Sequence, residues 1–91
     1  METYKETHDK SKMLYIGIDV HKTTWHVTIM QDEEIRFSGS LTAQWRTLQQ
    51  LLDRYRTPCI SCQAVYEAGY FGYWLHDRLQ EYGVPCIVTP P

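Results

Sequence analysis

The chain has 91 residues, 43% of them hydrophobic, which is enough for one small globular domain and argues against intrinsic disorder. No apolar run approaches the roughly 20 residues that span a bilayer, so we expect no membrane partner and a cytoplasmic location. The formal net charge is −2 and the basic residues are scattered, so the chain lacks the basic stripe typical of a protein that binds nucleic acid through its own charge.

The first part of the chain predicts a leader followed by three strands. Residues 1–12 are polar and charged, without the apolar centre of a signal peptide, and we expect a disordered leader before a folded domain at 13–91. Apolar and polar residues then alternate from Leu14 to Asp19 and again from Trp25 to Met30, as in strands. After a polar break of hairpin length, a short third strand begins at Ile35 and is expected to end at Gly39.

The rest of the chain alternates between helical and extended patterns. Apolar residues at three- and four-residue steps over 45–55 predict a helix with Thr42 as its N-cap and Pro58 beyond its end. Alternation over 60–67 predicts a fourth strand, a second helix closes at Gly83, and 84–88 predicts a fifth strand. The order strand, strand, strand, helix, strand, helix, strand predicts an α/β domain, with a meander followed by parallel crossovers.

Two features could carry chemistry but have simpler interpretations. Cys59 and Cys62 form a CxxC pair, but positions three apart on a strand point to opposite faces and no second ligand pair exists, so Cys62 is interpreted as buried apolar filler. Aromatic residues at the start of the second helix could stack on nucleic-acid bases, yet Phe71 shares the apolar helical face of Leu75 and Leu79, which favours a place in the core. These aromatic residues are Tyr70, Phe71, Tyr73 and Trp74.

Two acidic residues at strand ends are the candidate site. Asp19 ends the first predicted strand and Glu67 ends the fourth, where α/β sheets place functional groups. A pair of such carboxylates can hold Mg²⁺, which prefers oxygen ligands, and two metal ions can promote cleavage of a phosphodiester. Taken singly, each residue also fits a turn former or a solvated surface group.

The residues around both acids resemble one family. Tyr15-Ile-Gly-Ile-Asp-Val-His-Lys22 resembles the opening of the DEDD-type insertion-sequence transposases, the bridge-RNA-guided family. Val65-Tyr-Glu-Ala-Gly69 resembles the second acidic motif of that family, and Leu79-Gln-Glu-Tyr-Gly-Val-Pro-Cys86 resembles the segment that leads into its fifth strand. The resemblance runs from about Leu14 to Pro91.

This resemblance implies a fold, a metal site and partners. The fold would be a partial ribonuclease-H-like (RuvC-like) domain with a mixed five-stranded sheet in the order 3-2-1-4-5. The site would hold Mg²⁺ through four carboxylates, of which Asp19 and Glu67 match two, while the other two and a C-terminal domain with a serine nucleophile are expected beyond this chain. The partners would be DNA and a guide RNA, with His21 and Lys22 as candidate phosphate contacts. The chain would thus be a fragment of an enzyme for DNA strand cleavage and transfer, inactive alone.

The strand order also predicts how the two faces of the sheet differ. Right-handed crossovers that move in the same direction place both helices on one face. That face should be lined by Leu14, Ile16, Ile18, Trp25, Val27, Ile29, Cys62 and Ala64. The opposite face should carry Tyr15, Asp19, His26, Thr28, Met30, Ser61, Gln63 and Val65. His26, on this face, is interpreted as a structural residue. Because an apolar strip of this face is left uncovered, we expect self-association through the face or through the edge of the fifth strand.

Two other functions fit parts of the pattern. An actin-like ATPase or sugar-kinase lobe also opens with a Gly-Ile-Asp strand, but it needs glycine just after the aspartate so that backbone amides approach phosphate, and this chain has Val20-His21-Lys22. A non-enzymatic remnant or regulatory fragment of a transposase is the second alternative. Magnesium binding and DNA cleavage would distinguish the nuclease from the remnant, and ATP binding would identify the lobe.

Overall fold

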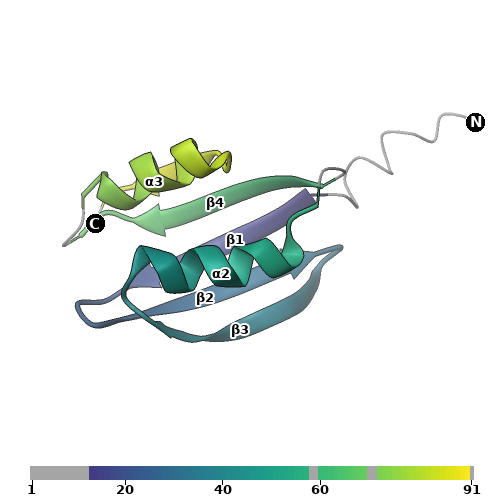
Figure 1. The fold of residues 1–91 in the computed structure, drawn as a ribbon, viewed down its shortest axis with the longest axis horizontal. Coiled ribbons are helices and arrows are strands. Elements are labelled where there is room, and N and C mark those ends of the chain that lie inside the picture. Colours follow the sequence, from purple (N-terminus) through teal and green to yellow (C-terminus); the bar gives the residue numbers. More distant parts are fainter. Residues whose placement is uncertain (1–12, 58–59, 70–71, 91) are drawn as a thin grey trace, which may run out of the picture.

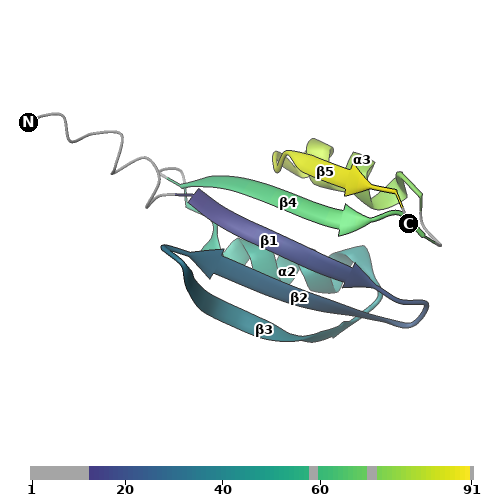
Figure 2. The same ribbon diagram turned by 180° about the vertical axis from the view of Figure 1, so that it is seen from behind.

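Five strands and two helices make up the part of the chain that the computed structural model describes, which is residues 13–57, 60–69 and 72–90. The predicted leader, Pro58, Cys59, Tyr70 and Phe71 lie outside the described residues. The elements are β1 (Met13–Val20), β2 (Thr24–Gln31), β3 (Glu34–Thr42), α2 (Trp45–Tyr55), β4 (Ser61–Glu67), α3 (Trp74–Tyr82) and β5 (Cys86–Thr89). They form one sheet in the order β3-β2-β1-β4-β5, which confirms the predicted order (Figures 1 and 2).

The first three strands form an antiparallel meander, and β4 and β5 add to it in parallel. β1 pairs antiparallel with β2 and parallel with β4, while β5 pairs parallel with β4. The β2–β3 connection is the two-residue turn at Asp32 and Glu33, which have φ values of 56° and 64°. Positive φ at both central residues matches the right-handed twist of the flanking strands, so this turn fixes the hairpin register.

β3 is longer than the sequence predicted. The prediction that Gly39 ends this strand is wrong, because Gly39 pairs with Val27 in the middle of β3. The Phe37 ring covers the position where Gly39 lacks a side chain, since a Cβ built there would lie 3.1 Å from Phe37 Cζ. A neighbouring aromatic ring can therefore compensate for the weak strand tendency of glycine.

Helix α2 matches its predicted span, whereas α3 begins at Trp74, later than predicted, and one helix cap also needs correction. Gln44, and not Thr42, is the N-cap of α2, because β3 continues through Thr42. Thr47 Oγ1 instead donates to the carbonyl oxygens of Thr42 and Gln44, at 2.7 and 2.8 Å. Gly83 ends α3 in the left-handed region, with φ 101°, as predicted for a C-cap.

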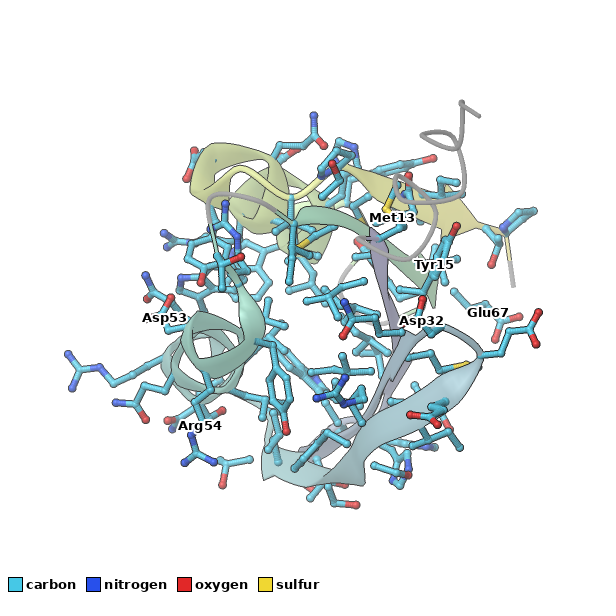
Figure 3. All side chains as sticks on the ribbon, turned by 90° about the vertical axis from the view of Figure 1, so that its right-hand side faces the viewer. Met13, Tyr15, Asp32, Asp53, Arg54 and Glu67 are labelled. Carbon is cyan, nitrogen blue, oxygen red and sulfur yellow. The ribbon has the colours of Figure 1, made fainter. Side chains whose placement is uncertain are left out.

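The core lies between the sheet and the two helices, which cover the same face (Figure 3). The eight side chains predicted to line this face are all buried, as are Leu48, Leu51 and Leu52 of α2 and Leu75 and Leu79 of α3. The opposite face carries exposed or half-buried residues throughout, including Tyr15 and Met30. The predicted assignment of residues to the two faces is confirmed, and we call the uncovered side the open face.

Cys62 belongs to the core, as predicted. Its side chain is buried and the thiol is free, and burial raises the pKa of Cys62 above its ordinary value. A thiol that resists ionisation is a poor nucleophile and a poor metal ligand, which supports the interpretation as apolar filler. Within the described ranges, no helix has the length and apolar character to cross a membrane.

Candidate functional site

The fold brings Asp19 and Glu67 to the same end of neighbouring parallel strands. β1 and β4 are paired up to Ile18 and Tyr66, so Asp19 and Glu67 are the next residue along each strand. Both carboxylates are exposed on the open face, and Glu67 points away from the helices in Figure 3. Both line a hollow of about 340 Å³. The sequence-based prediction that these two residues lie on adjacent strands at one end of the sheet is therefore confirmed.

The floor of this hollow is formed by small or uncharged residues of the sheet. A Cβ on Gly17 would meet nothing within 4 Å, so the space above the backbone of β1 is open beside Asp19. Thr28, Val65 and Thr89 also line the hollow, and Thr89 is the cross-strand partner of Glu67. Among the described residues that line this concave surface, further oxygen atoms come from hydroxyls and backbone.

His21 lies against the first carboxylate. Its Nε2 is 3.2 Å from Asp19 Oδ2, and its backbone N–H donates to Thr24 O in the turn between β1 and β2. The two side chains are 63% and 71% exposed, so water screens the pair and its contribution to stability is small. Lys22 is exposed in the same turn. The predicted phosphate contacts of His21 and Lys22 remain a prediction.

His26 also lines the hollow, which the sequence-based interpretation as a structural residue did not anticipate. It is the cross-strand partner of Asp19 on one side and of Ser40 on the other. Its Nε2 is 3.0 Å from Ser38 Oγ, and its Nδ1 is 3.5 Å from Ser40 Oγ. The alternation of apolar and polar residues in the sequence already indicates that His26 lies on the same face as Asp19. Their proximity depends in addition on the pairing of β1 with β2, which the sequence pattern does not give.

Tyr66 fixes the end of β4 that carries Glu67. Its ring is buried, its hydroxyl donates to Gly72 O, and it accepts the His76 backbone N–H at 3.1 Å. Burial is the main cause that raises the pKa of Tyr66, so the hydroxyl stays protonated and can donate. These two bonds join the carboxyl end of β4 to the start of α3, and thereby hold Glu67 at the sheet end.

The two carboxylates are the type of ligand that suits a hard cation, but they are few for a complete metal site. Asp19 and Glu67 supply carboxylate oxygens, the ligands that Mg²⁺ prefers. Among the residues that the structure describes, no group of three or more His, Cys, Asp or Glu side chains is placed to hold a metal ion. The two carboxylates could therefore form part of a metal site, with the remaining positions filled by water, substrate oxygens or other ligands.

Two of the four aromatic residues, Tyr73 and Trp74 at the start of α3, differ from their predicted place in the core, while Tyr70 and Phe71 lie outside the described residues. Tyr73 is 63% exposed and Trp74 is 41% exposed. The buried stripe of α3 runs through Leu75 and Leu79, so Tyr73 and Trp74 precede it and point toward the surface. The prediction of a core role is wrong for these two residues, because the helix begins later than the aromatic spacing suggested.

The chain is similar in sequence to a transposase. The chain is 27% identical over 82 residues to the transposase for insertion sequence element IS1533 of Leptospira borgpetersenii, covering 88% of this chain and 24% of that protein. The chain thus spans about a quarter of the length of this relative. No family model matches the chain.

A solved structure matches most of the chain. Argonaute from Marinitoga piezophila, crystallised with a 5′-OH guide RNA and target DNA, superposes with a TM-score of 0.53 at 13% identity, covering 94% of this chain and 17% of that chain. Together with the strand order, this likeness shows that the chain has a ribonuclease-H-like α/β fold.

Proposed function

We propose that this chain is the first part of a transposase nuclease domain, in which Asp19 and Glu67 supply two ligands to a Mg²⁺ site for DNA strand cleavage and transfer. The observation that carries the proposal is the placement of both carboxylates at the ends of adjacent parallel strands, above one hollow on the open face. The transposase relative supports the reaction class, and the ribonuclease-H-like fold supports a nuclease. DNA and a guide RNA are the proposed partners of the complete protein.

The chemistry that Mg²⁺ supplies in such a site is electrostatic: it lowers the pKa of a bound water and stabilises charge on the leaving oxygen. The residues of this chain hold and orient the ion. Asp19 and Glu67 provide the negative charge, and Tyr66 holds the strand end beneath Glu67. Two ligands do not fix the octahedral geometry of Mg²⁺, so the isolated chain should bind the ion weakly and leave DNA intact.

Metal binding tests this site directly. We expect Mn²⁺, used as a paramagnetic substitute for Mg²⁺, to broaden the amide signals around Asp19 and Glu67 in an NMR titration, with a Kd of about 10⁻³ M. Excess Mg²⁺ should reverse the broadening. Asp19→Asn should remove it, because half of the charge is lost, whereas Asp32→Asn, at the opposite end of β2, should leave it unchanged. Broadening centred elsewhere, or unaffected by Asp19→Asn, would contradict the assignment.

The same preparation tests the expected inactivity. Incubated with supercoiled plasmid and Mg²⁺, the chain should leave the plasmid uncut. Metal-dependent nicking that Asp19→Asn abolishes would show that the chain holds a complete site, and would overturn the expected dependence on further carboxylates.

We also propose that copies of the chain associate through the open face. Tyr15, Met30, Val65 and Ile87 lie on this face with exposures of 53%, 37%, 39% and 54%. A hollow of about 250 Å³ lies among Tyr15, Met30 and Val65, and such an apolar surface favours association in water. Its neighbour along the sheet is the carboxylate hollow, which shares Gly17, Thr28 and Val65 with it.

Sedimentation equilibrium measures this association. We expect Met30→Glu to weaken it at least about tenfold, or ~1.4 kcal/mol, because each association would bury an unpaired charge. Tyr73→Glu introduces the same charge at an exposed position outside the open face and should leave the association constant unchanged. A monomer at every concentration, or equal effects of both substitutions, would contradict the proposed interface.

A further inference from the structure

The exposed aromatic residues at the start of α3 form a patch with a cation. Tyr73 is the N-cap residue of α3 and Trp74 is its first helical residue, and both side chains are exposed. Arg78 follows Trp74 by one helical turn, and its guanidinium carbon lies 5.6 Å from the centre of the Trp74 ring. Two exposed rings, one of them with a guanidinium above it, form an exposed apolar patch, and such patches are informative features of a protein surface.

The surrounding contacts fix the orientation of both rings. Trp74 packs against the buried Trp25 at the start of β2, with ring centres 6.4 Å apart and planes tilted by 57°. Tyr73 meets the His76 ring edge-on, with ring centres 5.9 Å apart and an angle of 83°. On the other side of His76, Asp77 Oδ1 lies 3.2 Å from its Nδ1. Despite these contacts, 63% of the Tyr73 surface and 41% of the Trp74 surface remain exposed to solvent.

The patch lies at the same end of the sheet as the carboxylates. Trp25 pairs with Val20, the residue after Asp19, and Tyr73 follows Glu67 by six positions. Figure 1 shows the start of α3, the tip of β4 and the β1–β2 turn at one end of the domain. The carboxylates occupy the open face of this end, whereas the patch occupies the helix-covered side, with Lys22 exposed in the turn between β1 and β2.

We propose that Tyr73, Trp74 and Arg78 form a stacking site for unpaired bases of a single-stranded nucleic acid. An aromatic ring stacks on any base, a guanidinium adds attraction to the base face and to phosphate, and both interactions need a base that is not enclosed in a duplex. A basic groove would be expected for duplex binding, and the scattered charges of this chain provide none. The biological meaning of this site rests on the proposed function, because a strand held here would lie at the same end of the sheet as Asp19 and Glu67.

Fluorescence anisotropy with a labelled oligothymidylate of about ten nucleotides tests the stacking site. The measurement is made in EDTA, so its outcome does not depend on whether the carboxylates bind metal. The wild-type chain should bind this strand more tightly than an abasic strand of equal length, which has the same phosphates without bases. It should also prefer the single strand to the matching duplex.

The variants are chosen to keep the fold and to distinguish the effect of the aromatic ring from the effects of apolar surface area and of positive charge. Tyr73→Leu retains apolar surface but loses the ring, and should weaken binding at least about fivefold, the factor that corresponds to ~1 kcal/mol of stacking. Tyr73→Phe should bind like the wild type. Arg78→Gln should also weaken binding, whereas Arg54→Gln makes the same charge change on exposed α2 and should have little effect. Circular dichroism confirms that each variant is folded.

Three results would overturn the proposal: no binding of the oligothymidylate by the wild-type chain, equal affinity for the abasic strand, or equal affinity of Tyr73→Leu and Tyr73→Phe. The second result would mean that the chain contacts phosphates only. The third would mean that Tyr73 serves as apolar surface, as it would for a protein partner. Loss of Mn²⁺ binding in Asp19→Asn would stand in any of these cases, so this proposal and the proposed metal site can fail separately.

Discussion

Replacing Ile16 with lysine should unfold the domain, whereas the same replacement at its neighbour Tyr15 should leave it folded. Ile16 is 1% exposed on the helix-covered face of the central strand, while Tyr15 is 53% exposed on the open face. Ile16→Lys removes a buried side chain and buries an ammonium group without a partner. The combined cost exceeds the few kcal/mol that stabilise a domain of this size, about 0.05–0.15 kcal/mol per residue.

Far-UV circular dichroism and thermal melts distinguish the two variants. Ile16→Lys should show no cooperative transition, and Tyr15→Lys should melt within a few degrees of the wild type, because its lysine remains in water. The opposite result, a folded Ile16→Lys and an unfolded Tyr15→Lys, would mean that the register of β1 is shifted by one residue and that the two faces are exchanged.

The second large effect is expected from the buried hydroxyl of Tyr66. Tyr66→Phe keeps the ring but leaves the Gly72 carbonyl and the His76 N–H without their partner. Each part-buried polar group that loses its partner costs about 1–3 kcal/mol, so the melting temperature should fall by at least about 10 °C. The loss should be concentrated where β4 meets α3, so the His76 amide should exchange faster with solvent.

Tyr82→Phe is the matched control. The Tyr82 hydroxyl donates to Asp53 Oδ1, which is exposed, so water can replace the lost partner. The Tyr82 ring, which lies 4.3 Å from the Arg56 guanidinium carbon, is retained in the variant. This substitution should therefore cost less than about 1 kcal/mol. An equal or larger loss than in Tyr66→Phe would show that the Tyr66 bonds do not stabilise the junction.

Much of this fold could be predicted because its faces are sharply different. The alternation at Leu14, Ile16 and Ile18 defines the buried side of β1, and the helical stripe at Leu75 and Leu79 defines the buried side of α3. The handedness of parallel crossovers then places both helices on one face. The positions of the two carboxylates could be predicted as well, because the carboxyl ends of parallel strands lie at the same edge of the sheet.

The features that could not be predicted depend on contacts between residues that lack a sequence pattern. The continuation of β3 through Gly39 depends on where the Phe37 ring lies. The place of His26 in the hollow depends on the register of β2 against both neighbours. The exposure of Trp74 depends on where α3 begins. Local sequence spacing does not distinguish an aromatic residue just before a buried helical stripe from one within the stripe.

The pairing of β1 with β4 also determines when the candidate site comes into existence. The meander from β1 to β3 closes through short turns, but Asp19 and Glu67 are 48 positions apart (67 − 19). Closing a loop of this length costs more entropy than closing a hairpin. The contacts between the parallel strands β1 and β4 stabilise the chain only after the crossover is complete. A chain with only its meander formed presents Asp19 without Glu67. Any ion that requires both carboxylates therefore binds only the finished sheet, and by mass action it draws the population of partly folded chains toward that state.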